Sequence, residues 1–149
     1  MRVFLDLNVL LDVIQKREPH YAASAAILSR IASGEIEGAM SAHAVTTIHY
    51  LVAKLAGREP ALEAIDWLLR ELEIVPEDKE NFLRARVLGM DDFEDAVVAA
   101  AAEKSGCDHV VTRNVGDFAD SPVPAVSPGE LEAALTEPQP PDDPVSMRD

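Results

Sequence analysis

The stretch RVFLDLNVLLDVI, residues 2–14, decides the fold class of this chain. The run from Arg2 to Leu5 predicts a short buried strand that ends at Asp6. The apolar spacing from Val9 to Ile14 then predicts a helix, with Asn8 as a suitable N-cap. A strand that leads directly into a helix is typical of an α/β fold built on a parallel sheet.

The same alternation continues along the rest of the chain. Apolar runs predict further strands at 36–40, 73–75, 109–112 and 123–126. Helical spacing and capping residues predict helices at 19–34, 41–55, 61–72, 78–88, 92–105 and from 127 onward. On the helix at 61–72, one face is expected to carry the core residues Leu62, Ile65, Leu69 and Leu72, with Trp67 joining the core. Strands separated by helices predict a parallel sheet covered on both faces.

Size and composition indicate one globular domain. The chain has 149 residues, of which 48% are hydrophobic. We expect the domain to span 1–135 and the segment 136–149, rich in proline and aspartate, to be a disordered tail. No apolar run is long enough to cross a membrane, and Asp6 comes too early for a signal peptide, so a cytoplasmic location is expected. The single cysteine, Cys107, excludes an internal disulfide and a cysteine-rich zinc site.

The net charge of −14 limits the kinds of nucleic-acid protein that this chain can be. Passive binding to a phosphate backbone needs a basic face, which the charge argues against. An enzyme that handles phosphate through a metal is still allowed, because a bound divalent ion reverses the local charge of clustered carboxylates. The sequence contains neither a glycine-rich phosphate loop nor a Gly-x-Ser-x-Gly elbow, which excludes nucleoside-triphosphate and serine-hydrolase readings.

Four aspartates are placed to meet at one edge of the predicted sheet. In open α/β sheets, ligands bind beyond the carboxyl ends of the strands. Asp6 directly follows the first strand, and Asp117 lies just past the strand at 109–112. Asp92 and Asp95 begin the helix that leads into that strand, and their spacing puts them on one side of the helix. Carboxylates gathered in this way predict a site for a hard divalent cation.

Each acid also has a plainer explanation, which the sequence leaves open. Asp92 is a suitable N-cap, Asp6 is placed to cap the first helix, and Asp117 is placed to shape the turn at Gly116. Four other residues are expected to have no role in chemistry: Asp12 and Asp91 as solvated or capping acids, and His43 and His49 as ordinary helix residues.

Four segments, in the right order along residues 1–135, resemble the motifs of PIN-domain nucleases. The segment FLDLNVLLD at 4–12 is similar to the opening motif, and DFEDA at 92–96 is similar to the central motif. VVTRNVGDF at 110–118 is similar to the third motif, and PAVSPGEL at 124–131 resembles the closing strand and helix. The resemblance implies a PIN-like three-layer α/β/α fold with a central, mostly parallel sheet of four to five strands.

The resemblance also implies an activity. It implies a metal-dependent endoribonuclease that hydrolyses phosphodiester bonds in RNA, most often the VapC-type toxin of a toxin–antitoxin pair. An antitoxin protein is then the expected partner, and a homodimer is expected to form through the helices near 19–72. The chemistry is assigned to Asp6, Asp95 and Asp117 as ligands of Mg²⁺ or Mn²⁺, Asp92 as a fourth contributor, and Asn8, Thr112 and Asn114 as residues that orient ligands or water. Arg113 is placed either to contact a phosphate or to form a surface salt bridge.

Two departures from the family pattern support an alternative. Thr47 stands where the family usually has a glutamate, and Asn114 stands where its third motif often has an acid. Both favour a degenerate PIN domain that acts as a non-catalytic binding module. A phosphatase of the haloacid-dehalogenase kind is less favoured, because Asn8 stands where its Asp-x-Asp signature has the second acid.

Overall fold

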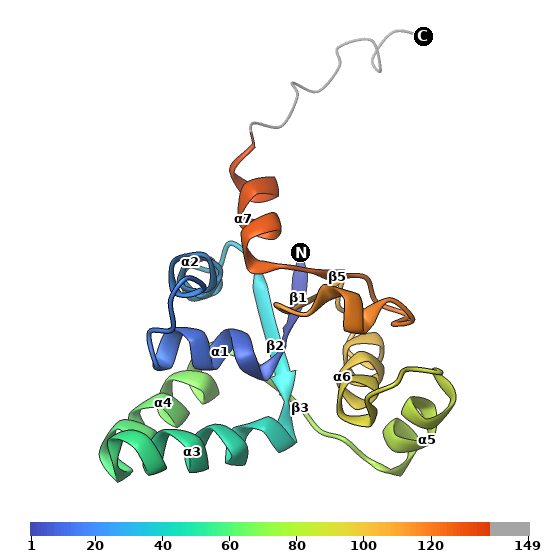
Figure 1. Cartoon of the computed structure of the whole chain (residues 1–149), viewed down its shortest axis with the longest axis horizontal. Coiled ribbons are helices and arrows are strands. Elements are labelled where there is room, and N and C mark those ends of the chain that lie inside the picture. Colours follow the sequence, from blue (N-terminus) through green and yellow to red (C-terminus); the bar gives the residue numbers. More distant parts are fainter. Residues whose placement is uncertain (138–149) are drawn as a thin grey trace, which may run out of the picture.

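A parallel sheet forms the centre of the computed structural model, which describes residues 1–137 (Figure 1). Its strands lie in the order β3-β2-β1-β4-β5, and every neighbouring pair is parallel. Their bounds are β1 Arg2–Leu5, β2 Glu37–Ser41, β3 Glu73–Val75, β4 His109–Val111 and β5 Ala125–Val126. The predicted α/β fold with a parallel sheet is therefore confirmed.

Helices connect the strands and cover both faces of the sheet. Their bounds are α1 Leu7–Ile14, α2 Tyr21–Ala32, α3 Ala42–Ala56, α4 Arg58–Glu71, α5 Lys79–Val87, α6 Phe93–Lys104, the 3-10 helix η1 Val115–Phe118 and α7 Pro128–Thr136. Helices α1 to α4 and α7 contribute to one core, whereas α6 and η1 contribute to a second core. Helix α5 packs on α6. The three-layer α/β/α arrangement implied by the motifs is thus confirmed.

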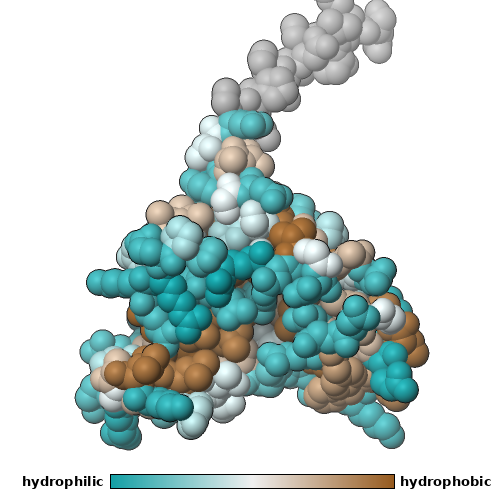
Figure 2. Space-filling view, in the orientation of Figure 1, coloured by the Kyte–Doolittle hydropathy of each residue, from teal (hydrophilic) through white to brown (hydrophobic). Residues whose placement is uncertain are grey.

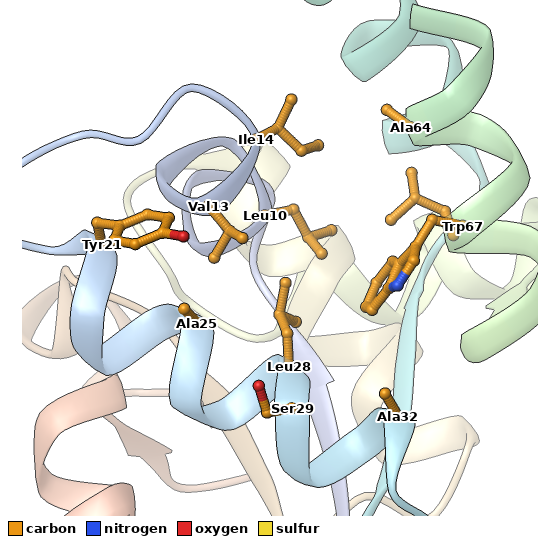
Figure 3. A pocket seen from close by; sticks show the side chains of 11 residues that line it. Leu10, Val13, Ile14, Tyr21, Ala25, Leu28, Ser29, Ala32, Ala64 and Trp67 are labelled. Carbon is orange, nitrogen blue, oxygen red and sulfur yellow. The ribbon is translucent and has the colours of Figure 1, made fainter. Parts of the chain in front are cut away.

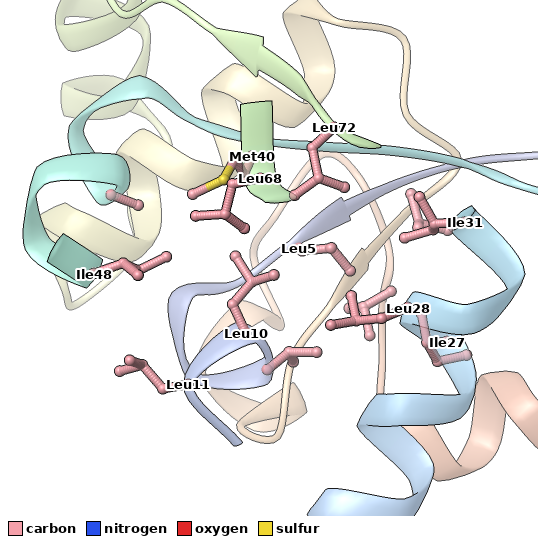
Figure 4. Close-up of a cluster of buried hydrophobic side chains, with 14 of the residues drawn as sticks. Leu5, Leu10, Leu11, Ile27, Leu28, Ile31, Met40, Ile48, Leu68 and Leu72 are labelled. Carbon is pink, nitrogen blue, oxygen red and sulfur yellow. The ribbon is translucent and has the colours of Figure 1, made fainter. Parts of the chain in front are cut away.

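The two cores use alternate side chains of the same strand. Val3 and Leu5 of β1 belong to the first core, shown in Figure 4, and Phe4 belongs to the second. This alternation follows from the two-residue period of a strand, and it makes β1 apolar on both faces. Burial of these side chains fixes the position of the next residue, Asp6, at the carboxyl edge of the sheet.

Local differences from the prediction concern where helices begin and which face they bury. Helix α1 starts at Leu7, so that Asp6 rather than Asn8 occupies its N-cap position. On α4, Leu68 is buried and Leu69 is 58% exposed, so the predicted core face was wrong at that position. The stripe that packs on the core contains the buried residues Ala61, Leu68 and Leu72 and the partly buried Ile65, which follow the helical spacing. Trp67 is partly buried against this core, as expected.

The expected tail falls outside the part of the chain that the structure describes. Of the segment 136–149, only Thr136, the last residue of α7, and Glu137 are described. Among residues 1–137, no helix combines the length and the apolar character that crossing a membrane requires.

Candidate active site

Asp6 and Thr112 lie side by side at the carboxyl ends of two neighbouring strands. Leu5 of β1 pairs with Val111 of β4, so the residues that follow them are level. The Asp6 amide donates to the Val111 carbonyl oxygen at 3.0 Å, and the Thr112 hydroxyl donates to Asp6 Oδ2 at 2.9 Å. From β1 the strand order runs one way to β2 and β3 and the other way to β4 and β5. Open parallel sheets bind ligands at this kind of switch point.

The Asp6 carboxyl is buried in a way that helix capping does not explain. Burial raises the pKa of Asp6, and the hydrogen bond from the Thr112 hydroxyl partly opposes this rise. Although Asp6 occupies the N-cap position of α1, its side chain makes no capping hydrogen bond. A buried carboxylate is costly to a fold, so its presence at a strand end favours a functional role.

Asp92 and Asp95 begin α6, and the two have different surroundings. Asp92 is the N-cap, and its side chain accepts a hydrogen bond from the Asp95 amide at 2.9 Å, which confirms the capping explanation for this residue. The pKa of Asp95 is raised to about 6, first by burial and then by the charges of Asp92, Asp6 and Asp117. Acids from three separate segments therefore act on one another at this edge.

Asp117 reaches the same edge through a turn after β4. The Asn114 amide donates to the Thr112 hydroxyl at 3.1 Å, and the Asp117 amide donates to the Asn114 carbonyl oxygen at 3.0 Å. The side chain of Asp117, on η1, is exposed, yet its charge contributes to the raised pKa of Asp95.

The chemistry of the four acids suits a hard divalent cation, but the acids lie too far apart to hold one as they are. Carboxylate oxygens are preferred ligands of Mg²⁺, and a bound cation would relieve the repulsion between Asp95 and the neighbouring carboxylates. Among residues 1–137, however, no three His, Cys, Asp or Glu side chains stand close enough to hold an ion as they are. Binding would have to draw Asp95 and Asp117 toward Asp6, so their role as ligands stays a prediction.

Replacing Asp95 with asparagine is expected to stabilise the metal-free protein at neutral pH. The pKa of Asp95 is raised from 3.8 to about 6, so its ionisation costs the folded state more than the unfolded state. This cost is absent at a pH below the pKa of Asp95 in the unfolded state and complete at a pH above its pKa in the folded state. After solvent screening we expect a gain of about 1 kcal/mol near neutral pH, which shrinks as the pH falls toward about 4.

Thermal unfolding of the native chain and of Asp95→Asn in chelator, at neutral pH and at a pH of about 4, measures this gain in stability. Asp66→Asn, at an exposed acid on α4, is the matched control and should change the melting temperature little. A melting temperature for Asp95→Asn that is unchanged or lower at neutral pH would contradict the expectation.

Asp12 and Arg113 form a buried ion pair next to the acids. Asp12 is fully buried on α1, and Arg113 Nε lies 2.9 Å from its Oδ2. Neither atom makes a well-aligned hydrogen bond, so the attraction between them is mainly Coulombic. The expectation that Asp12 is solvated or capping was therefore wrong. Apolar neighbours on both sides of Asp12 in the sequence, from Val9 to Ile14, were the signal for a core position.

A second charged group, also missed from the sequence, lies where β2 and β3 end. His43 Nδ1 lies 3.1 Å from Oε1 of Glu77, a side chain only 5% exposed, and His43 Nε2 lies 3.9 Å from Oε1 of Glu94. Thr47 donates its hydroxyl to the His43 carbonyl oxygen at 3.4 Å. His43 is therefore more than an ordinary helix residue, and Glu77 brings to this edge a carboxylate that no motif predicted.

An apolar cavity of about 350 Å³ lies away from these acids, between α1, α2 and α4 (Figure 3). Leu10, Leu28 and Trp67 point into it, and none of its lining residues is acidic. It is therefore not a place for a cation, and the candidate site is the acidic edge of the sheet.

Comparison with known proteins gives matches over most of the chain. Residues 2–116 match the PIN domain family. Ribonuclease VapC1 of Aquifex aeolicus is 25% identical over 118 residues, which cover 76% of this chain and 81% of that protein. The crystal structure of VapBC2 from Rickettsia felis bound to a promoter DNA fragment matches with a TM-score of 0.67 at 20% identity, covering 85% of this chain and 98% of that chain. A toxin–antitoxin complex from Klebsiella pneumoniae matches with a TM-score of 0.65 at 20% identity, covering 85% and 97%.

Proposed function

The chain belongs to the PIN domain family, and on that premise we propose that it is a divalent-metal-dependent endoribonuclease. It hydrolyses phosphodiester bonds in RNA as the toxin of a toxin–antitoxin pair. The observation that supports the proposal is the raised pKa of Asp95, to which the charges of Asp92, Asp6 and Asp117 contribute from three segments of the chain. The relative named as a ribonuclease and the neighbour named as a toxin–antitoxin complex support the same function.

We assign the ligands of Mg²⁺ or Mn²⁺ to Asp6, Asp95 and Asp117, with Asp92 as a further contributor. A bound divalent ion lowers the pKa of a water molecule and offsets the charge that develops on a phosphoryl group. Thr112 holds Oδ2 of Asp6, which fixes the plane of the carboxylate. Asn8 and Asn114 are assigned to orient ligands or water from the starts of α1 and η1.

Added Mn²⁺ is expected to raise the melting temperature by several degrees. An ion that binds only the folded state stabilises it by mass action, by about 2.7 kcal/mol when its free concentration is about 100 times its Kd. Asp95→Asn should reduce the effect, because it removes one of the charges that the ion neutralises. A thermal-shift titration with Mn²⁺, against NaCl of equal ionic strength, measures both. No shift across the millimolar range would rule out the metal site.

We propose that the chain forms a homodimer and pairs with an antitoxin protein. Exposed apolar side chains on the helices after β2 support self-association: Tyr50 and Leu55 on α3, and Leu69 on α4. Figure 2 shows hydrophobic surface on this side of the molecule and a second patch over α5 and the start of α6. The second patch contains Phe82, Leu83, Val87 and Phe93.

Sedimentation at micromolar concentration is expected to give a dimer that Leu69→Asp dissociates. The new charge would be buried against the second copy without a partner, which weakens association strongly. Leu83→Asp, at an equally exposed leucine on α5, is the matched control and should leave the dimer intact. A monomeric native chain would contradict the dimer, and dissociation by Leu83→Asp alone would move the interface to α5.

A further inference from the structure

A cavity of about 300 Å³ opens between the start of α2 and the start of α7. It is lined by His20, Ser24, Arg113, Ser127 and Gly129, together with apolar atoms of Pro19 and Pro128. Asp6, Thr112 and Ser127 each follow directly on residues that are in register across β1, β4 and β5. Two strand spacings separate the backbone of Asp6 from that of Ser127, about 10 Å. The cavity therefore lies at the same edge of the sheet as Asp6, on the side of β4 and β5.

Helix α7 offers its amino-terminal end to this cavity. The Ser127 side chain accepts a hydrogen bond from the Glu130 amide at 3.1 Å, whereas the Gly129 amide, also in the first turn, has no partner within the helix. The positive end of the helix dipole and an amide without a helical partner are favourable to an anion.

Two side chains add to this preference. Arg113 directs Nε to Asp12 and is 27% exposed. Ser24 is fully buried, and its hydroxyl has no hydrogen-bond partner within residues 1–137. A buried hydroxyl without a partner costs about 1–3 kcal/mol, which a ligand in the cavity would recover. A guanidinium, a hydroxyl and a helix amide together form the donor set that proteins use for phosphate.

We propose that this cavity binds a backbone phosphate of the RNA, next to the phosphate that is cleaved. The proposal rests on the proposed nuclease function and adds to it a subsite for substrate. The net charge of −14 repels RNA, so the chain needs a local site that attracts phosphate close to its acids. Pro19 and Pro128 give the cavity apolar walls, which suit a ribose rather than a second charge.

Gly129→Asp tests the subsite against Gly129→Asn, which has the same shape without the charge. A Cβ at Gly129 would meet nothing within 4 Å, and a carboxylate in the first turn favours the helix, so both variants are expected to fold. In steady-state cleavage of a single-stranded RNA with Mn²⁺, Gly129→Asp should raise KM about tenfold and leave kcat within about twofold. Gly129→Asn adds the same bulk without the charge, so its increase in KM should be clearly smaller than that of Gly129→Asp.

An RNA series with one neutral methylphosphonate linkage at a time locates the phosphate. At a single linkage, neutralisation should raise KM for the native chain about as much as Gly129→Asp does, and should raise it no further in Gly129→Asp. Equal KM values for the native chain and Gly129→Asp, or a neutral linkage whose effect adds fully to that of Gly129→Asp, would overturn the subsite.

Titration of the chelated protein with inorganic phosphate separates this proposal from the nuclease function. Saturable amide shifts at Gly129 and Ser24 in NMR spectra are expected, and they should be absent in Gly129→Asp. If these shifts appear but RNA is not cleaved, the nuclease function fails and the anion site stands. If RNA is cleaved while phosphate gives no shifts and Gly129→Asp leaves KM unchanged, the subsite fails alone. Shifts without any change in KM would refute its assignment to RNA.

Discussion

Asp6→Asn is expected to lower the rate of RNA cleavage about a thousandfold. A loss of this size is typical when a group that stabilises charge in the transition state is removed. Asp6 is the one buried member of the four acids, and it lies at the switch point of the sheet. Asparagine keeps the shape and an oxygen that can accept the Thr112 hydroxyl, but it loses the charge. Because burial raises the pKa of Asp6, the neutral side chain should leave the melting temperature of the metal-free protein unchanged or higher.

The assay compares the native chain, Asp6→Asn and Asp66→Asn on one single-stranded RNA with Mn²⁺. Asp66 is an exposed acid on α4, so its variant should retain native activity. Residual activity in Asp6→Asn above about a tenth of the native rate would mean that the nuclease site lies elsewhere. A native chain that cleaves no RNA but still binds an antitoxin would instead support the degenerate binding module.

Much of the fold was predictable because short stretches of sequence determine where strands and helices form. The stretch 2–14 predicts a strand, an acid and a helix in that order, and the structure has all three. Helix ends were also well predicted where one residue decides them. Ser127 caps α7, and Gly57, with a φ of 94°, ends α3 in a conformation that favours glycine. Boundaries were less accurate where no such residue marks them, as at the start of α4.

The candidate site was only partly predictable, because its contacts join distant parts of the chain. The rule for strand ends brought Asp6, Asp95 and Asp117 to one edge, and their charges do act on one another there. No local pattern pairs His43 with Glu77, or Arg113 with Asp12, since each contact depends on how strands and helices pack. The same limit explains Leu69, whose exposure depends on the exact rotation of α4.

Arg113→Met is expected to lower the free energy of unfolding by about 3 kcal/mol or more. The change leaves Asp12, which is fully buried, without its counter-charge. Asp12→Asn should cost less, about 1–2 kcal/mol, because Arg113 is 27% exposed and its charge can turn toward water. In the double variant Asp12→Leu with Arg113→Met, no buried charge is left unpaired, so much of the loss should be recovered.

Urea unfolding in chelator measures these free energies, and the chain offers a matched control in Arg84. Arg84 makes two hydrogen bonds to Glu103, at 2.9 and 3.1 Å, but the two side chains are 46% and 40% exposed. Arg84→Met should therefore cost much less than Arg113→Met, in spite of its better hydrogen-bond geometry. If Arg113→Met costs no more than Arg84→Met, burial does not decide the strength of the pair. If Asp12→Asn costs more than Arg113→Met, an unpaired guanidinium at Arg113 destabilises the fold more than an unpaired carboxylate at Asp12, which contradicts the expectation.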